Sequence, residues 1–401
     1  MSGSKPQRFD KSFTQQEAIP DEGIAAAIEV MQSGRLHRYN TIDDQPSETD
    51  WLEIEFSEYL GVSYALACAS GGYAIQVALR SAGVKSGDHV FCNAYTLAPV
   101  PGAIHNLGAI PVFIETTDQY TIDCDHLEQE ARRGRAQYLL LSHMRGHLVD
   151  MDRLMAICVA HNITLIEDCA HTMGASWDGK KSGTWGKVSC FSCQTYKHIN
   201  SGEGGFLVSN DEQLMARAVI YSGSYMLYGK HKAAPSAAAF DTVKYTTPNF
   251  SGRMDNLRAA ILRPQLRQLE QQCARWNELY DALERELRDE SEIYLPRRPL
   301  KESFVGSSLQ FSLPRFEAKE IEVLVANCSA RGVELKWFGR DEPQGYTSRM
   351  DSWRYLEDLP DLPNTQRVLA HMLDIRLPLT FDESDCKVLA AIIKDAYQSM
   401  G

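Results

Sequence analysis

Short apolar runs alternate with longer amphipathic segments over the first half of this chain. Five of the apolar runs are typical of buried strands and lie at residues 62–69, 89–94, 110–115, 136–143 and 163–170. Between them, apolar residues at helical spacing predict helices at 73–83, 97–107, 125–133 and 151–161. Because strands and helices alternate and the strands are apolar almost throughout, the pattern predicts a parallel sheet covered by helices on both faces.

The pattern changes in the middle of the chain. Two further apolar runs, 189–194 and 205–211, have only a loop between them, so the later part of the sheet should be built differently from the earlier part. An amphipathic stretch at 20–33 predicts a helix that ends near Gly34. Residues 222–250 lack periodicity, which in a compact enzyme indicates an active-site or interface loop.

A long helical pattern follows at 253–290, and Pro264 should kink this helix or break its first part. Beyond it, the apolar pattern predicts one strand and two helices, at 307–314, 318–332 and 384–398. We therefore predict three parts: an N-terminal segment with a large domain at 1–252, a connecting helix at 253–289 and a smaller α/β domain at 290–401.

Composition narrows the classes of function. The 401 residues are 44% hydrophobic and 23% charged, as in an ordinary globular protein. A formal net charge of −12 argues against non-specific nucleic-acid binding, which requires a basic surface. No apolar run reaches the length of a membrane span, and the N-terminus lacks the apolar core of a secretory signal. The 10 cysteines are scattered along the chain as in reduced proteins, so we expect a cytoplasmic location.

One acid and one lysine form a specific chemical pair. Asp168 lies at the end of a predicted buried strand, and Lys197 lies in a loop just before the glycine-rich Gly202–Gly205. A lysine in such a loop can hold an aldehyde cofactor as a Schiff base, while the aspartate keeps the ring nitrogen of that cofactor protonated. Together they would make pyridoxal 5'-phosphate (PLP) an electron sink.

The residues around this pair resemble a known family. Leu165–His171, Phe191-Ser192, Lys197 and Gly202–Gly205 are similar to the motifs of the DegT/DnrJ/EryC1/StrS aminotransferases, often called sugar aminotransferases. Further similar blocks lie at 68–79, 87–96, 108–116, 143–152, 253–266 and 359–368. The resemblance implies PLP fold type I, an α/β fold with a mixed, mostly parallel sheet in the large domain and a smaller C-terminal α/β domain. It also implies PLP bound covalently at Lys197 and pyridoxamine 5'-phosphate as an intermediate.

The cofactor's phosphate requires fixed donors. Ser70-Gly71-Gly72-Tyr73 joins a predicted strand to a helix, so backbone amides of Gly71, Gly72 and Tyr73 should face one point. The resemblance adds Ser192 as a phosphate ligand. In the family, Gly72 is usually a threonine and Tyr73 a small residue, so this chain lacks one hydroxyl donor.

The resemblance also bears on the rest of the cofactor pocket. His171 would hold the ring oxygen or lie against the ring, although a merely packed histidine is the alternative. Leu97 stands where the family commonly has the aromatic residue that stacks on the ring, and Tyr95 is a candidate substitute. Arg253 matches the family arginine, and Ser251 replaces the asparagine that reaches the partner subunit's phosphate. We therefore expect a homodimer with shared active sites.

Two other motifs carry less weight. His143 and His147 resemble half of a zinc-binding helix, but Gly146 and the preceding strand make helical geometry doubtful, so we expect no metal. Cys190 and Cys193 lie in and beside a predicted strand and should be buried thiols.

The resulting hypothesis is a PLP-dependent aminotransferase that uses a small-molecule amino donor and a keto or aldehyde acceptor, with neither nucleic acid nor membrane as a partner. The family implies a keto sugar or cyclitol as acceptor. Arg340 and Arg349 near aromatic residues could instead bind a small acid, or could be ordinary surface residues. The alternatives are therefore transamination, elimination, decarboxylation or cyclisation of a non-sugar small acid, and a non-catalytic protein of the same fold.

Overall fold

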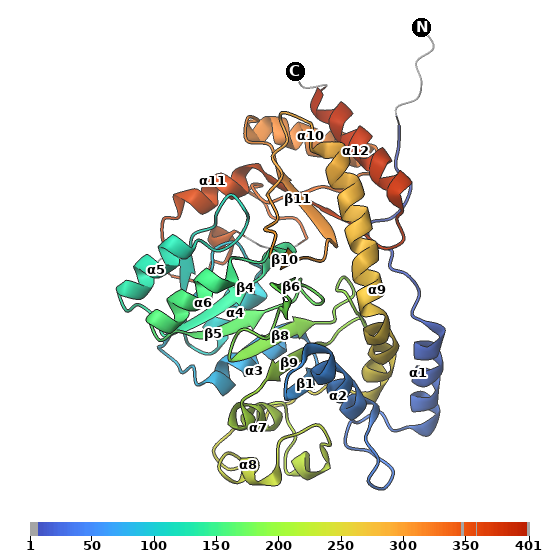
Figure 1. Ribbon diagram of the computed structural model, residues 1–401, viewed down its shortest axis with the longest axis vertical. Coiled ribbons are helices and arrows are strands. Elements are labelled where there is room, and N and C mark those ends of the chain that lie inside the picture. The colour runs from blue at the N-terminus through green and yellow to red at the C-terminus, as the bar shows by residue number, and fades with distance from the viewer. Residues whose placement is uncertain (1–6, 346–348, 358, 399–401) are drawn as a thin grey trace.

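A computed structural model describes residues 7–345, 349–357 and 359–398. At its centre is a seven-stranded sheet in the order β1-β9-β8-β5-β4-β2-β3 (Figure 1). Its strands are β1 Tyr64–Cys68, β2 His89–Asn93, β3 Ile110–Ile114, β4 Tyr138–Ser142, β5 Thr164–Asp168, β8 Val188–Ser192 and β9 Gly205–Ser209. Neighbouring strands are parallel except that β9 is antiparallel to both β8 and β1. The prediction of a mixed, mostly parallel sheet is therefore confirmed.

Helices cover both faces of this sheet (Figure 1). One hydrophobic cluster includes side chains of α2 Glu48–Leu60, α5 Cys124–Arg132, α6 Met151–Ala160 and α9 Asn256–Leu287. The other includes side chains of α3 Gly71–Ala82, α4 Pro99–Asn106, α7 Glu212–Tyr221 and α8 Ala237–Asp241. Alternate residues of β4 enter opposite clusters: Leu139 and Leu141 the first, and Leu140 the second. The strands are apolar throughout because both of their faces are buried.

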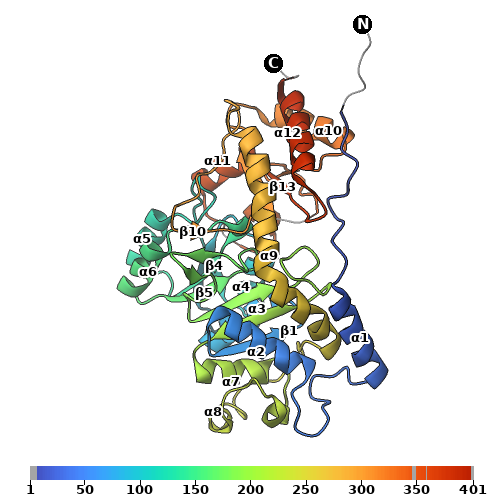
Figure 2. The same cartoon turned by 45° about the vertical axis from the view of Figure 1, so that its right-hand side comes forward.

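Helix α9 continues unbroken past Pro264. Pro264 therefore does not break the helix. Figure 2 shows that the axis of α9 changes direction along its length. The N-terminal helix α1 Asp21–Ser33 packs beside α9 and ends at Gly34, whose φ of 68° is left-handed as in a common helix C-cap.

A smaller antiparallel sheet in the order β11-β13-β12 lies beyond α9. Its strands are β11 Ser308–Ser312, β12 Lys336–Trp337 and β13 Met372–Arg376, and the helices of this part are α10 Ala318–Ala330, α11 Pro363–His371 and α12 Glu383–Gln398. Its apolar residues Leu309, Phe311, Leu373 and Ile375 enter a third hydrophobic cluster with α9, α10 and α12. The residues that alternate with them, Ser308, Gln310, Ser312 and Asp374, are polar and yet also buried. The polar face of this sheet is therefore covered by protein rather than open to solvent.

Three short strands, β6 Ser176–Trp177, β7 Lys180–Lys181 and β10 Glu302–Ser303, form a third sheet. Because β10 comes from the C-terminal part of the chain, this sheet ties the two parts together. Residues 222–250 contain only a short 3₁₀ turn at Leu227–Lys230 and α8, in agreement with their lack of periodicity. Within the described ranges, no helix is both long and apolar enough to cross a membrane. The division of the chain at 252/253 and 289/290 stays a prediction.

Candidate active site

Lys197 lies in the loop between β8 and β9, at the edge where the parallel strands end. Its Nζ donates a hydrogen bond of 2.8 Å to Nε2 of His171. Burial of the amine and the positive charge of Arg145 lower the pKa of Lys197 to about 7, although the carboxylate of Asp168 acts in the opposite direction. A large fraction of the amine is therefore neutral near pH 7, which is the form that attacks an aldehyde.

Two neighbouring carboxylates at the end of β5 have opposite surroundings. The carboxylate of Glu167 accepts hydrogen bonds from the backbone amides of Gly183, Trp185 and Gly186, from the Ser189 hydroxyl and from His143 Nε2. Burial alone would raise the pKa of Glu167, but the hydrogen bonds from His143 and the backbone amides hold it below its usual value. Glu167 is thus an ionised structural carboxylate.

Asp168 points to the other side of β5 and has fewer partners. Within the described residues it accepts hydrogen bonds from the Ser142 hydroxyl and the Ala170 amide, each at 3.1 Å. Burial raises the pKa of Asp168, and the positive charge of Lys197 only partly opposes this shift. A buried carboxylate in this state is stabilised by a cationic donor, and the protonated ring nitrogen of PLP is such a donor. Asp168 therefore fits a position beside the ring nitrogen of this cofactor.

His171 is the acceptor for the Lys197 amine. Burial and the positive charge of Lys197 lower the pKa of His171 well below its usual value, so its ring is neutral at pH 7. A neutral imidazole can accept a hydrogen bond from the lysine at Nε2 and still offer its other nitrogen as a donor. The structure thus brings Lys197 and His171 together, while a contact of His171 with the cofactor stays a prediction.

The predicted phosphate ligands lie together at the start of α3. Ser70 caps this helix by accepting a hydrogen bond of 3.1 Å from the Tyr73 amide. Ser192 is directly beside the helix start, because a Cβ atom on Gly71 would lie only 2.8 Å from the Cβ of Ser192. The first amides of the helix, those of Gly71 and Gly72, have no acceptor within the helix. Together with the Ser192 hydroxyl they form a donor set that suits a phosphate.

Tyr73 is placed differently from the other predicted ligands. Its hydroxyl lies 2.9 Å from the carbonyl oxygen of Tyr221 and 2.7 Å from that of Phe250, and its ring fills the space beside Gly252. The amide of Tyr73 already bonds to Ser70. Its side chain therefore fixes the ends of the segment 222–250, and its role as a phosphate ligand stays a prediction.

Tyr95 and Thr96 follow β2 at the same edge of the sheet. The ring of Tyr95 is buried edge-on against Phe338, with 5.2 Å between ring centroids, and its stacking on the cofactor stays a prediction. The Thr96 hydroxyl is buried and has no hydrogen-bond partner within the described part of the chain. It is therefore a further polar group available to a ligand here, which the sequence analysis did not assign.

Arg253 and Ser251 lie next to the phosphate ligands. The backbone bridges Arg253 to Cys68 of β1, and the Gly252 carbonyl accepts a hydrogen bond of 2.7 Å from the Ala69 amide. The guanidinium of Arg253 donates to the Gly223 carbonyl. Ser251 is exposed, as a residue that reaches a second subunit would be.

The two discounted motifs have ordinary surroundings. His143 contacts Glu167 at 3.2 Å and His147 contacts Gln310 at 2.7 Å, so the two rings serve different partners. The intervening Met144–Gly146 is a 3₁₀ turn rather than an α-helix, as the glycine suggested. Cys190 and Cys193 are buried free thiols, which confirms their interpretation.

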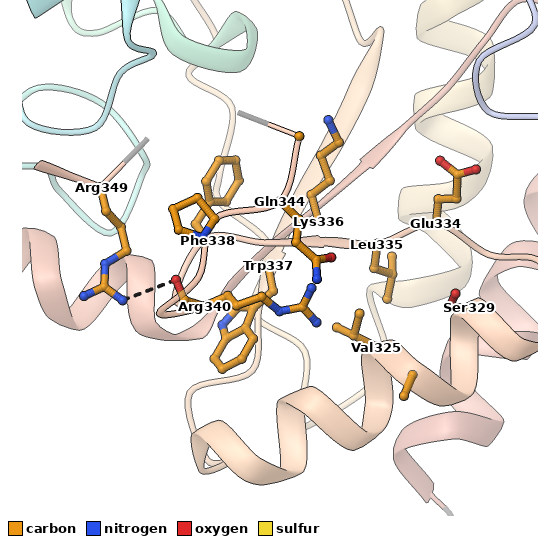
Figure 3. A pocket seen from close by; sticks show the side chains of 13 residues that line it. Val325, Ser329, Glu334, Leu335, Lys336, Trp337, Phe338, Arg340, Gln344 and Arg349 are labelled. Carbon is orange, nitrogen blue, oxygen red and sulfur yellow. Dashed lines mark hydrogen bonds between the residues drawn. The ribbon is translucent and has the colours of Figure 1, made fainter. Parts of the chain in front are cut away.

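Arg340 and Arg349 line a cavity of about 420 Å³ between α10 and β12 (Figure 3). Arg340 forms an ion pair with Glu322 at 2.7 Å, and Arg349 forms ion pairs with Asp341 at 3.1 Å and Asp351 at 2.5 Å. Their charges are therefore balanced by neighbouring carboxylates. Tyr346, one of the aromatic residues near Arg349 in the sequence, lies outside the described residues.

Sequence analysis missed two arginines that act on Lys197. Arg145 and Arg376 both lower the pKa of Lys197, and the Arg376 guanidinium lies 3.8 Å from the ring centre of the adjacent Tyr196. Arg145 forms a buried ion pair with Asp374 at 3.2 Å. Arg145 lies inside one of the blocks that resemble the family, 143–152, which is the one feature of the sequence that could have identified it. No sequence motif pointed to Arg376.

Comparison with known proteins decides the family. The model of the DegT/DnrJ/EryC1/StrS aminotransferase family matches residues 17–393. This chain belongs to that family. Membership of the family implies dependence on PLP, and the residues described above fit this cofactor.

Several relatives show how far the similarity extends. The dTDP-3-amino-3,4,6-trideoxy-alpha-D-glucose transaminase of Micromonospora megalomicea subsp. nigra is 33% identical over 251 residues, which cover 62% of this chain and 61% of that protein. The S. venezuelae protein DesV, solved in complex with a ketimine intermediate, has a TM-score of 0.78 at 25% identity over 94% of both chains. The structure of 3-amino-5-hydroxybenzoic acid synthase has a TM-score of 0.82 at 24% identity, over 96% of this chain and 99% of that one. The chain spans only 57–61% of the length of three curated relatives that it matches, the Micromonospora megalomicea transaminase among them.

Proposed function

We propose that this protein is a PLP-dependent aminotransferase that passes an amino group from an amino acid to a keto or aldehyde acceptor. The observation that carries the proposal is the pair of Lys197, whose amine has a pKa of about 7, and Asp168, a buried carboxylate with a raised pKa, at one edge of the large sheet. When bound, PLP supplies an electron sink for the substrate carbon. The protein supplies the lysine, the carboxylate and the phosphate ligands that orient it.

Each residue has a proposed role. Lys197 holds the cofactor covalently and then, as a free amine, moves a proton at Nζ during the reaction. Asp168 keeps the ring nitrogen protonated, and His171 positions the Lys197 amine. Gly71, Gly72 and Ser192 bind the phosphate. Pyridoxamine 5'-phosphate links the two half-reactions, in which first the donor and then the acceptor enters the same site.

The first candidate acceptor is a keto sugar or cyclitol. It is supported by relatives named as a dTDP-amino-sugar transaminase and as GDP-perosamine synthases. The second candidate is a non-sugar small acid, and the observation that favours it is the pair of arginines beside Lys197. Elimination, decarboxylation or cyclisation of such an acid is the alternative chemistry for the same residues.

An absorbance experiment tests the proposed reaction. Protein loaded with PLP is mixed with L-glutamate or L-glutamine, and the spectrum should change to that of pyridoxamine phosphate. Addition of a keto acceptor should then restore the first spectrum. Release of ammonia or carbon dioxide without pyridoxamine phosphate would contradict transamination, and a colourless, inert protein would contradict any PLP enzyme.

We also propose a homodimer with shared active sites. Helix α1 exposes an apolar stripe of Ile24, Ile28 and Met31, which are 44%, 43% and 55% exposed. Tyr225 and Met226, which are each 57% exposed, lie in the segment 222–250 beside Arg253. Large apolar side chains of this kind mark contact surfaces between proteins. A two-fold axis would give two equivalent sites, each completed by the neighbouring chain.

Complementation tests the shared site. Lys197→Ala and Arg253→Ala subunits, each inactive alone, are mixed under conditions of subunit exchange. A mixed dimer holds one site with both lesions and one with neither, so part of the activity should return. A monomer in sedimentation, or no rescue in proven heterodimers, would contradict the proposal.

The cytoplasmic location also stays a prediction, with which the 10 free, buried cysteines agree.

A further inference from the structure

A further cavity lies against the loop that carries Lys197. It has a volume of about 510 Å³, between helix α9 and residues 16–21 of the N-terminal segment, and Lys197 is among its lining residues. Figures 1 and 2 show this segment running alongside α9 before it enters α1. A volume of this size is in the range of small-molecule sites, which is about 300–1,000 Å³. The cavity can therefore hold a small molecule next to the loop of the reactive lysine.

One face of α9 gives this cavity a wall of side-chain amides. Gln265, Gln268 and Gln272 recur at helical spacing, and all three line the cavity. The amide of Gln265 is occupied, because its Nε2 donates a hydrogen bond of 2.8 Å to the Asn200 carbonyl and its Oε1 accepts one of 2.9 Å from the Asn200 backbone amide. These bonds hold the lysine loop to α9 and fix Asn200, another lining residue, at the cavity.

Two of the side-chain amides are available to a ligand. Within the described residues, the side chains of Asn200 and Gln268 form no hydrogen bond with the protein. Gln272 is partly used, because its Oε1 accepts a hydrogen bond of 2.7 Å from Arg275. A side-chain amide both donates and accepts hydrogen bonds, as a hydroxyl group does. Amides and hydroxyls can therefore pair with each other without any charge.

Trp276, one turn further along the same face of α9, adds an apolar surface. Its indole N–H donates to the Leu377 carbonyl at 3.0 Å, and its ring lies edge-on to that of His198, with 5.1 Å between centroids. Ile19 and Leu379 extend this surface. Small-molecule sites usually combine such an apolar lining with a few polar groups. The ring of a polyol, which is apolar along its C–H bonds and polar at its hydroxyls, fits both kinds of surface.

The charges around the cavity do not suit an acid. Among the described residues that line it, Lys197 is the one lysine or arginine, and Glu17 and Asp21 are carboxylates. Glu17 is paired with Arg275 of α9, at 2.8 Å. Burial and the positive charge of Lys197 lower the pKa of His198 to about 3, so this ring is neutral at pH 7. An acid group would therefore find no positive charge in this lining apart from the reactive lysine itself.

We propose that this cavity is a subsite for a neutral, hydroxyl-rich part of the acceptor, which the amides of Asn200 and Gln268 hold against Trp276. The inference rests on the proposed aminotransferase function and deepens it, because it assigns the acceptor to the polyols rather than to the small acids. The amino donor carries its own acid groups and is not part of this assignment. Asn200 and Gln268 are therefore specificity-determining residues for the second half-reaction.

Calorimetry of the PLP-loaded protein tests the subsite without any turnover. Myo-inositol and D-glucose are the neutral probes, and malonate is the acid probe, which should not displace them. Asn200→Ala and Gln268→Ala should each weaken polyol binding by about three- to tenfold, as expected for loss of one hydrogen bond between neutral groups. Gln271→Ala is the matched control and should leave the affinity unchanged, because Gln271 is exposed on the same helix outside the cavity lining.

The outcomes separate the subsite from the function. No binding of either polyol would overturn the subsite, and so would displacement of the polyol by malonate. Equal affinities in wild-type protein and both test variants, with native circular dichroism, or an equal loss in Gln271→Ala, would also overturn it. Polyol binding that depends on Gln268, in a protein whose PLP form is not converted by any amino donor, would overturn the proposed function and leave the subsite standing.

The two half-reactions then separate the acceptor from the donor. The pyridoxamine form is mixed with L-erythrulose, a neutral hydroxy ketone, or with pyruvate, a keto acid, and return of the PLP spectrum is followed. The rate with L-erythrulose should exceed that with pyruvate and should fall by about three- to tenfold in Gln268→Ala. Conversion of the PLP form by L-glutamate should not change in this variant. A faster reaction with pyruvate, or an equal loss in the L-glutamate reaction, would contradict the assignment of the cavity to the acceptor.

Discussion

Two walls face Lys197, and they are built in different ways. The first wall belongs to the large sheet and comes from Asp168 and His171, which are three positions apart at the end of one strand. The second wall belongs to the small sheet and collects Lys336 and Arg376 from two strands, with Arg145 from a distant turn. The first wall provides the groups proposed to hold the cofactor ring, whereas the second carries cationic side chains of which two, Arg145 and Arg376, act on Lys197. The difference suggests that the first wall carries the chemistry and the second selects the substrate.

The largest effect should come from the lysine between the walls. Lys197→Ala removes both the covalent attachment and the proton carrier, so turnover should fall by about 10⁴-fold, the upper range for one positioned acid–base group. Lys336→Ala, a lysine of the second wall, is the matched comparison and should keep the cofactor spectrum. Both variants are measured by absorbance and steady-state rate. A cofactor spectrum lost equally in both variants would contradict the division of roles.

The next effect separates the two carboxylates of β5. Asp168→Asn should lower turnover by about 10²–10³-fold, because the ring nitrogen loses its charged partner, while thermal stability stays near that of the wild type. Glu167→Gln should do the reverse and lower stability by about 2–3 kcal/mol, because it places an amide among donors that require an acceptor. Turnover and calorimetric melting are measured for both. Near-normal turnover in Asp168→Asn would refute its role.

A smaller effect concerns the influence of the positively charged second wall on the pKa of Lys197. In cofactor-free protein, Lys197 should react with trace acetic anhydride with a midpoint near its pKa of about 7. Nearby positive charge disfavours the protonated amine, so Arg145→Gln should move this midpoint to higher pH. Peptide mass spectrometry across a pH series measures it. A midpoint unchanged or lowered in Arg145→Gln would show that the arginine does not act on the lysine.

The smallest effect is expected at the outer cavity. Arg340 and Arg349 are balanced by Glu322, Asp341 and Asp351, so replacing either arginine by glutamine should change kcat and KM less than about twofold, as is usual for exposed ion pairs. Steady-state kinetics with the best donor and acceptor measure this. A large rise in KM would indicate that the substrate binds in the cavity of Figure 3 rather than at the second wall.

The first wall could be predicted from the sequence because its residues are neighbours in the chain. A strand that ends in Asp168 and a glycine-rich loop after Lys197 can be recognised in the sequence without knowing where the strand lies in the sheet. The five strands of the first half of the chain and the helices between them were predictable for the same local reason, since each shows its own periodicity.

The second wall could not be predicted from the sequence, because its residues are brought together only by the topology of the fold. Arg376 becomes relevant only when β13 pairs with β11 and turns its polar face toward Lys197, and no local pattern encodes that pairing. For Arg340 and Arg349 the sequence left two interpretations open, because their ion pairs with Glu322 and Asp341 are evident only in three dimensions. Helix α2 was also missed, although Ser47 and Asp50 form a capping box that a search for helix starts could have found.

The most direct test of the central claim is chemical. PLP-loaded protein is reduced with sodium borohydride, digested and mapped by mass spectrometry, which fixes the cofactor to the lysine that holds it. The peptide that contains Lys197 should carry the cofactor mass, and Lys197→Ala protein should show no such adduct. A cofactor mass on Lys336 or any other lysine of the wild-type protein would contradict the account.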